Sequence, residues 1–352
     1  MHSDHGGYNM NNKTLATLAF TSLLAPNLSL AMSSEPTPLP TPIPSPNTQV
    51  SIIAIGDMGT GEEAQYEVSR AIEAVCAEKS CDFAIGLGDN IYEVGIDSAQ
   101  DQQMLTKFEY PYDNLEFPFY MALGNHDNST IDGLGLNNNK GEHQVEYHYQ
   151  ADRYSEKWNM PARYYRFAAP VASEAKLVDI FALDSNPLAA LSDLNPEYYQ
   201  IPYKKKQQAW FEEQLSTSQT PWRIAFAHHP YISNGRHGNA GLYDNIPLLG
   251  IVWHNFLEQS VCDNVDLLIT GHDHDLQYLK PRENCGSTEF IVSGAGAKTR
   301  SFSDANRNDV FWQQDKTKGF FRLNFIGNEL TVEAYTVEAG QHELAYTRVI
   351  QK

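Results

Sequence analysis

An apolar run gives way to a Gly-Asp pair at residues 50–59, VSIIAIGDMG. The run over 50–55 has the length of a strand, and apolar residues then recur at helical spacing over 61–78. This stretch therefore predicts a strand, a polar loop and a helix. Four further apolar runs end in the same way in a short polar loop, and they lie at 83–87, 119–123, 224–227 and 265–269. Continuous apolar runs of this length are typical of strands that are covered on both faces.

The polar loops after these runs carry five short motifs. They are Gly56-Asp57-Met58-Gly59, Gly88-Asp89-Asn90-Ile91-Tyr92, Gly124-Asn125-His126-Asp127, Ala227-His228-His229-Pro230 and Gly271-His272-Asp273-His274. Open α/β sheets bind ligands outside the carboxyl ends of their strands, so we expect the motifs to meet on one rim. Two metals held by such side chains clamp a phosphate ester and lower the pKa of a bound water. Together the motifs therefore predict a two-metal phosphate-ester site.

The rest of the chain indicates the fold class. Residues 177–183 predict another buried strand and 206–215 an amphipathic helix, while 290–292, 320–325, 330–336 and 344–350 alternate apolar and polar residues, as antiparallel strands do. We expect an α/β (α+β) fold, namely a four-layer α/β/β/α sandwich of two mixed sheets flanked by helices. We expect it to form one domain over residues 49–352.

The first residues indicate export rather than fold. Lys13 precedes an apolar stretch over 15–24 and a small-residue exit at Ser29-Leu30-Ala31, so residues 1–31 predict a signal peptide. The stretch is shorter than the roughly 20 apolar residues of a membrane span, which leaves an uncleaved anchor as the weaker alternative. Translation could start at Met1 or Met10. Residues 32–48 are rich in proline and predict a linker to a secreted or periplasmic domain.

The net charge excludes two kinds of binding partner, and the number of cysteines predicts disulfides. The net charge of −19 argues against nucleic-acid wrapping and against attraction to an anionic membrane, because both need clustered Lys and Arg. Four cysteines in an exported chain predict two disulfides, and the local pairing is Cys76 with Cys81 and Cys262 with Cys285, although three pairings are possible. A zinc site is the weaker alternative, since no pair has the usual two-residue spacing.

The five motifs resemble those of the purple acid phosphatases, within the calcineurin-like metallophosphoesterases, and particularly the small tartrate-resistant type. The likeness runs from about residue 50 to the C-terminus, and it includes Ser293-Gly294-Ala295-Gly296. Most other metallophosphoesterases have a His at the position of Gly59 and lack a Tyr at the position of Tyr92. These two positions therefore distinguish the subgroup.

The resemblance implies a ligand set. Asp57, Tyr92 and His274 would bind Fe(III), and Asn125, His228 and His272 would bind a divalent ion, which is Fe(II), Zn or Mn. Asp89 would bridge the two metals. The ligand chemistry agrees, because carboxylate and phenolate oxygens suit a trivalent ion, whereas imidazole and amide groups suit a divalent one.

Two further histidines, His126 and His237, match the family's outer positions. The resemblance implies that they orient the phosphate and protonate the leaving group. We expect Asp127 to hold His126 in its working tautomer. His229 neighbours a ligand, but we interpret it as a packing or substrate-contact residue. The stretch 128–154 is longer than in mammalian-type relatives and could form a lid or wall over the site.

The resulting hypothesis is an exported acid phosphatase that hydrolyses small phosphate monoesters by direct attack of a metal-bound hydroxide. A phosphodiesterase or nucleotide pyrophosphatase on the same scaffold is the nearest alternative. A silent metal- or phosphate-binding protein is the alternative outside the enzymes. We expect no stable membrane insertion after signal cleavage, and the sequence leaves the oligomeric state open.

Overall fold

The strand-loop-helix unit predicted at residues 50–59 begins the fold, with strand β1 (Gln49–Ile55) leading into helix α1 (Glu63–Glu78). The computed structural model describes residue 45 and residues 47–352, so the predicted signal peptide and most of the predicted linker lie outside the described residues. The apolar positions of α1 that the sequence places at helical spacing are buried, namely Val68, Ala71, Ile72 and Val75. The helix therefore packs with one face on the core.

The first sheet has seven strands in the order β14-β13-β12-β1-β2-β3-β4. Strands β1 to β4 run parallel to one another, whereas β12 pairs antiparallel with β1 and begins an antiparallel β12-β13-β14 edge. The strands after β1 are β2 (Phe83–Leu87), β3 (Phe119–Ala122), β4 (Trp158–Asn159), β12 (Lys318–Ile326), β13 (Glu329–Glu338) and β14 (Gln341–Gln351).

The second sheet also has seven strands, in the order β11-β9-β10-β8-β7-β6-β5. Its central strands β6, β7, β8 and β10 are parallel, and antiparallel partners flank them on both sides. The strands are β5 (Tyr165–Ala169), β6 (Val178–Ala182), β7 (Trp222–Phe226), β8 (Leu267–Thr270), β9 (Leu276–Leu279), β10 (Glu289–Ser293) and β11 (Val310–Gln314). Both sheets are therefore mixed, as predicted.

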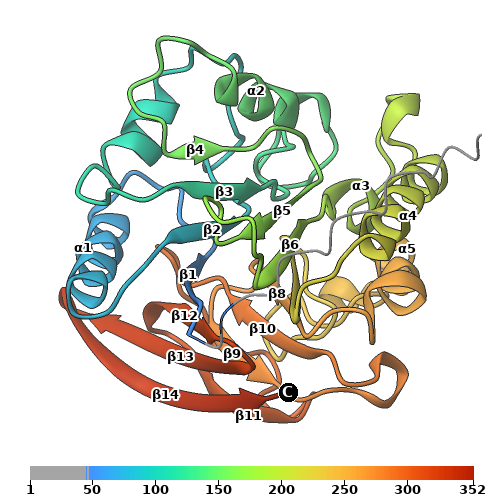
Figure 1. Ribbon diagram of the computed structural model, residues 1–352. Helices are drawn as coiled ribbons and strands as arrows, with labels where there is room; N and C mark the ends of the chain where they lie inside the picture. Colours follow the sequence, from blue (N-terminus) through green and yellow to red (C-terminus); the bar gives the residue numbers. More distant parts are fainter. Residues whose placement is uncertain (1–44, 46) are drawn as a thin grey trace, which may run out of the picture. The chain divides into compact units, whose positions relative to one another are not determined.

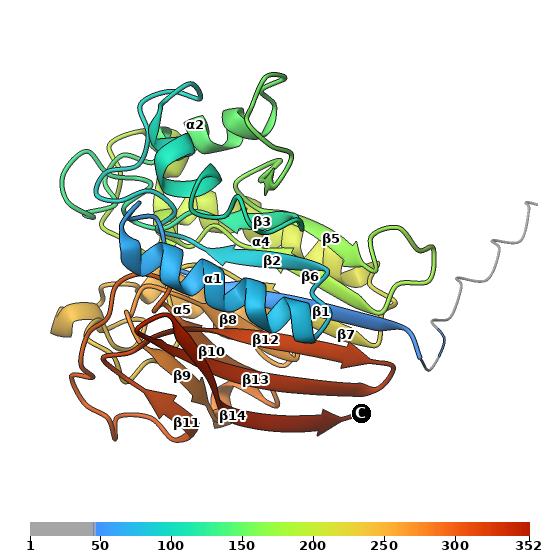
Figure 2. The ribbon, with the colours of Figure 1, turned by 90° about the vertical axis from the view of Figure 1, so that its left-hand side faces the viewer.

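Helices cover the outer face of each sheet. Figures 1 and 2 show α1 beside the first sheet, and α4 (Gln200–Ser216) and α5 (Ile251–Phe256) beyond the second. One apolar core lies between the sheets, and a second joins β6, β7 and β8 to α4 and α5 through side chains such as Phe181, Phe211 and Trp253. The predicted four-layer α/β/β/α sandwich is thus confirmed.

Two segments differ from the sequence prediction. The stretch 128–154 is not a loop throughout, because it contains helix α2 (Asn139–His148), which places Tyr147 against Trp158 of β4. The run at 290–292 is not simply a strand of an antiparallel end, because β10 lies parallel to β8 and antiparallel to β9. Phe290-Ile291-Val292 is a continuous apolar run rather than an alternating one. Such a run cannot identify its partner strands, since pairing depends on how the chain returns between the sheets.

The local cysteine pairing is confirmed. Cys76 is bonded to Cys81 and Cys262 to Cys285, and no free cysteine remains. The first bridge closes the turn between α1 and β2, and the second links the end of the α5 segment to the turn before β10. Among the residues that the structure describes, no helix is both long and apolar enough to cross a membrane.

A buried ion pair ties the segment between β4 and β5 to the end of β6. Arg163 donates from Nε to Asp184 Oδ2 at 2.6 Å and from Nη2 to Asn128 Oδ1 at 2.9 Å. The Tyr203 hydroxyl donates to the same oxygen of Asp184 at 2.6 Å. Arg163 is 7% exposed and Asp184 is fully buried, so neither charge can be compensated by water.

We expect Arg163→Ala to lower the free energy of unfolding by about 3–5 kcal/mol, because the substitution leaves the buried Asp184 charge without its partner. Denaturant unfolding measures the change. Arg70→Ala is the matched control, since the Arg70–Glu63 pair is mostly exposed and should contribute less than about 1 kcal/mol. Equal losses in the two variants would contradict this account of the buried pair.

Candidate metal centre

The five motifs meet at one edge of the sandwich. The loops that follow β1, β2, β3, β7 and β8 bring the seven predicted ligand side chains together, and all seven are buried. The carboxyl ends of parallel strands from both sheets point to this edge, which is why loops far apart in the sequence become neighbours. The predicted convergence of the motifs is therefore present in the fold.

The three side chains predicted to bind Fe(III) form a triangle. The Tyr92 hydroxyl lies 3.1 Å from Asp57 Oδ1 and 3.2 Å from His274 Nε2, and His274 Nε2 lies 3.4 Å from Asp57 Oδ1. Burial lowers the pKa of His274 to about 3, so its imidazole is neutral and offers a lone pair. Burial, followed by the charges of Asp57 and Asp89, raises the pKa of Tyr92 well above its ordinary value.

The side chains predicted to bind the divalent ion form a second group beside the first. His228 Nε2 lies 2.8 Å from Asn125 Oδ1 and 3.1 Å from His272 Nδ1. Asp89 Oδ1 is 3.4 Å from the same nitrogen of His228. One carboxylate oxygen each of Asp57 and Asp89 and one ring nitrogen of His228 all lie within 4.8 Å of one another. Asp89 therefore lies between the two groups, where a bridging ligand is expected.

The orientations of His228 and Asn125 test whether these atoms fit a metal. His228 Nδ1 donates to the Leu87 carbonyl at 2.8 Å, so in the neutral ring, the form that binds metals, Nε2 carries a lone pair. Asn125 Nδ2 donates to the Gly133 carbonyl at 2.7 Å, which turns the acceptor Oδ1 toward that lone pair. Two buried acceptors that face each other cannot satisfy one another. A cation satisfies both, so the residues present fit a bound metal.

The backbone at this edge is unusual at the ligand residues and closely packed at two neighbouring glycines. Asp57, Asp89 and His272 adopt positive φ angles of 57°, 53° and 70°, which non-glycine residues rarely do. A Cβ atom on Gly124 would lie 2.1 Å from Asp89 Oδ1, and one on Gly271 would lie 2.4 Å from Asp57 Oδ2. Gly124 and Gly271 therefore occupy positions where any side chain would displace a carboxylate.

The interpretation of Asp127 is wrong. Its carboxylate does not contact the His126 ring; it accepts hydrogen bonds from the backbone of Asn90, Ile91 and Gly124. These bonds fix the loop that carries Asp89 against the loop that carries Asn125. His126 is oriented instead by Glu93, whose carbonyl oxygen accepts from its Nδ1 at 2.6 Å. Asp127 is adjacent to His126 in the sequence, but its carboxylate is directed at the backbone of other loops.

The two outer histidines lie beside different ligand groups. His126 packs edge-on against Tyr92, with ring centroids 4.5 Å apart, whereas His237 stacks on His272 at 4.1 Å. His237 Nδ1 donates to Asp244 Oδ1 at 2.8 Å, and Arg300 Nη1 donates to its Nε2 at 3.1 Å. Burial lowers the pKa of His237, but the bond to Asp244 and the charge of Asp273 outweigh it, so the pKa is raised above its ordinary value.

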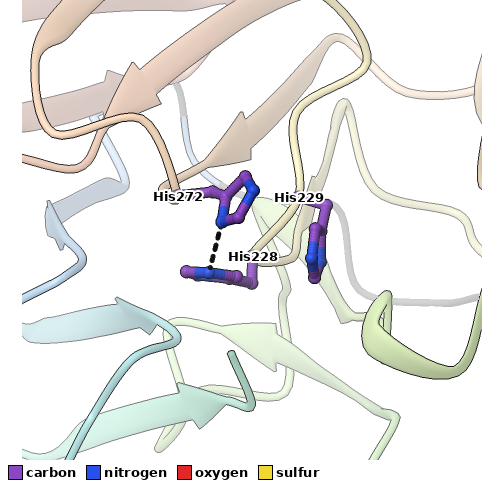
Figure 3. Close-up of side chains that lie close together, drawn as sticks. All are labelled: His228, His229 and His272. Atoms are coloured by element: carbon purple, nitrogen blue, oxygen red, sulfur yellow. Dashed lines mark hydrogen bonds between the residues drawn. The ribbon is translucent and has the colours of Figure 1, made fainter. Parts of the chain in front are cut away.

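Three residues at this edge were not predicted as metal ligands or proton donors. Figure 3 shows His229 close to His228 and His272, and one nitrogen of each lies within 4.8 Å of the others. His229 Nδ1 is 2.8 Å from Ser185 Oγ, which holds the ring at the border of the ligand group. The sequence feature that could have indicated this position is that His229 directly follows the predicted ligand His228.

The other two unpredicted residues are cations. Lys298 Nζ lies 3.5 Å from the centre of the Tyr92 ring and 2.8 Å from Glu93 Oε1, and Arg300 contacts His237 as described. Both follow the Ser293-Gly294-Ala295-Gly296 motif, which leads the chain from β10 to this edge. The motif was recognised, but the charges that follow it were not.

We expect Gly124→Ala to abolish tight metal binding, because the added methyl group overlaps the Asp89 carboxylate. Metal content of the purified protein, measured by elemental analysis, tests this. Gly340→Ala is the control: nothing lies within 4 Å of its Cβ position, although its φ of 75° adds a backbone strain that is absent at Gly124. Metal retained by Gly124→Ala would mean that Asp89 is not a ligand.

Comparisons with known proteins agree with this geometry. Residues 50–276 match the family model of the calcineurin-like phosphoesterases. The chain is 29% identical to tartrate-resistant acid phosphatase type 5 of Rattus norvegicus, over 84% of this chain and 85% of the relative. It is 26% identical to purple acid phosphatase 4 of Arabidopsis thaliana, over 82% and 80% of the two chains.

Solved structures share the fold. GAP50, the anchor in the inner membrane complex of Plasmodium, matches with a TM-score of 0.68 and 18% identity over 86% of this chain and 89% of its own. Purple acid phosphatase PPD1 from yellow lupin matches at 0.58 and 16% identity, over 87% and 54% of the two chains. The chain belongs to the calcineurin-like phosphoesterases and, as its motifs predict, is similar to the tartrate-resistant and purple acid phosphatases among them.

Proposed function

We propose that this protein is an exported acid phosphatase that hydrolyses small phosphate monoesters at a dinuclear centre of Fe(III) and a divalent ion, which is Fe(II), Zn or Mn. The observation that carries the proposal is the meeting of two ligand groups around Asp89. Asp57, Tyr92 and His274 would hold Fe(III). Asn125, His228 and His272 would hold the divalent ion, with Asp89 as the bridge.

When bound, such a metal pair would polarise the phosphate ester and lower the pKa of a water molecule. The protein's own side chains would bind the rest of the phosphate. His126 lies beside Tyr92 and His237 beside His272, so the two histidines flank the ligand groups. Lys298 and Arg300 add positive charge at the same edge of a chain whose net charge is −19.

His237 is the better placed proton donor of the two histidines, provided that Arg300 turns from its Nε2 to the phosphate and leaves that nitrogen free to carry a proton. Its Nδ1 is held by Asp244, and its ring is fixed by stacking on His272. A histidine held in this way can donate a proton to the oxygen of the departing alcohol. His126 is held through Nδ1 by the Glu93 carbonyl, and its Nε2 lies 3.9 Å from Asp89 Oδ2. We assign it to orienting the phosphate.

Export is part of the proposal. Both cysteine pairs are disulfide-bonded, and disulfides persist in oxidising compartments such as the periplasm or the cell exterior. The similarity to acid phosphatases favours the same reaction class in this chain. Among the alternatives, the two cations favour a doubly charged monoester over the singly charged phosphate of a diester. The complete set of ligands and both outer histidines argues against a silent binding protein.

We expect the iron-loaded protein to be purple and Tyr92→Phe to lose this colour, because the colour would arise from charge transfer between the phenolate and Fe(III). The visible absorption spectrum, with iron content determined on the same sample, is the measurement. Tyr112→Phe is the control, since Tyr112 is equally buried but lies outside the site and its hydroxyl has no hydrogen-bond partner. An unchanged spectrum in Tyr92→Phe would remove Tyr92 from the ligand set.

We expect His237→Gln to lower kcat for a phosphate monoester by about 10²–10⁴-fold, the usual contribution of a positioned proton donor. The metal content should stay unchanged, because His237 is not among the ligands. Steady-state kinetics with phenyl phosphate, beside elemental analysis, separates these two effects. His342→Gln is the control, since His342 lies on β14 and outside the centre.

The same assay decides between the enzyme alternatives. Diphenyl phosphate offers the same leaving group in a diester, so its rate relative to phenyl phosphate reports the charge that the site prefers. A faster diester would replace the phosphatase proposal with the phosphodiesterase alternative. Metal-loaded protein that hydrolyses neither ester would favour the silent binding protein.

A further inference from the structure

A pocket of about 210 Å³ opens beside the candidate metal centre. Asn125, His272 and His237 belong to its lining, so the pocket borders the group that would hold the divalent ion and the proposed proton donor. Any alcohol that leaves the phosphate next to His237 must lie in or pass through this space. The chemistry of the pocket wall therefore bears on which alcohol the site accepts.

Another part of the pocket lining is apolar. Leu134, Leu191 and Ile246 line it, and their side chains are 51%, 59% and 51% exposed. Exposed apolar residues are common when they occur singly. Here three of them come from three separate loops and line the same pocket. Further exposed apolar residues lie in the same loops, namely Ile131, Leu136, Leu194, Leu242 and Leu248.

The polar side chains of the pocket already have partners within the protein. Asn125 Nδ2 donates to the Gly133 carbonyl, and His229 Nδ1 is bonded to Ser185 Oγ. His237 Nδ1 donates to Asp244, which also lines the pocket. An alcohol rich in hydroxyl groups would lose its bonds to water here and gain few in return, which is unfavourable.

The apolar walls are fixed relative to the centre. The loop that carries Leu134 is bonded to Asn125 twice, because Asn125 Nδ2 donates to the Gly133 carbonyl at 2.7 Å and Ser129 Oγ donates to the Asn125 carbonyl at 2.6 Å. The loop that carries Ile246 is held to His237, whose carbonyl accepts from Asp244 N at 2.9 Å. Asn125 and His237 therefore fix the positions of Leu134 and Ile246 relative to the candidate metal centre, where the phosphate would bind.

We propose that this pocket binds the alcohol part of the substrate and selects phosphate monoesters of apolar, alkyl or aryl, alcohols over sugar phosphates. The proposal rests on the proposed phosphatase function. In the reaction, a bond forms between phosphorus and the oxygen of water, and the bond between phosphorus and the alcohol oxygen breaks. The alcohol leaves with a proton while its carbon chain lies against Leu134, Leu191 and Ile246.

The test compares n-hexyl phosphate with ethyl phosphate, because both alcohols have nearly the same pKa and differ only in apolar length. Since even one methylene in a hydrophobic pocket is worth roughly tenfold, we expect kcat/KM to be at least about tenfold higher for the hexyl ester. Glucose 6-phosphate should resemble ethyl phosphate or be slower. Leu134→Asn and Ile246→Asn should each bring the hexyl-to-ethyl ratio toward one.

Ile201→Asn is the matched control, because Ile201 is 54% exposed on α4 and does not line the pocket. It should keep the wild-type ratio. Each ratio is measured within one preparation, so the fraction of folded protein cancels. A wild-type ratio near one, or a ratio that both pocket substitutions leave unchanged, would overturn the proposal.

A separate readout distinguishes failure of this proposal from failure of the proposed function. n-Hexylphosphonate and ethylphosphonate cannot be hydrolysed, and calorimetry compares their binding to the metal-loaded protein. Tighter binding of the hexyl compound with no hydrolysis of any ester would support the pocket and overturn only the enzymatic proposal. Equal binding together with ester hydrolysis would overturn the pocket and leave the phosphatase proposal standing.

Discussion

The repulsion between buried lone pairs is the constraint on which the rest of this structure depends. With a neutral His228 ring, its Nε2 and Asn125 Oδ1 are two acceptors 2.8 Å apart, because Nδ1 of His228 and the amide of Asn125 donate to backbone carbonyls. Such an arrangement is unfavourable by itself, since buried acceptors need a donor or a cation. The protein must therefore hold its ligands against their own repulsion until a metal binds.

Groups that are not ligands provide this support. The Leu87 carbonyl fixes the His228 ring, and the Asp127 carboxylate clamps the loops of Asp89 and Asn125 together. The positive φ angles of Asp57, Asp89 and His272 show that the backbone itself is bent to present them. Rigid strand ends make this possible, because a loop anchored at both ends cannot relax away from the repulsion. The sandwich thus acts as the frame of the centre.

Much of this frame could be predicted from the sequence. Apolar runs ended by Gly-Asp, Gly-Asn-His or Gly-His mark both the strands and the ligands, and pairing each cysteine with its neighbour along the chain predicted the two disulfides. The role of Asp127, the helix inside 128–154 and the cations Lys298 and Arg300 could not be predicted in the same way. Each depends on which loop lies beside which other loop, and a motif records only neighbours along the chain.

The features that could be predicted from the sequence are the metal ligands, and the feature that could not is the substrate pocket. The ligands must occupy strand ends with fixed spacing, so they leave short local signals. The apolar pocket is built from Leu134, Leu191 and Ile246, which belong to three different connections and show no common pattern in the sequence. Loops of this kind can change without disturbing the frame, because few core contacts depend on half-exposed side chains. A scaffold that fixes the chemistry at strand ends therefore leaves substrate choice to the loops, where a folded structure is needed to see it.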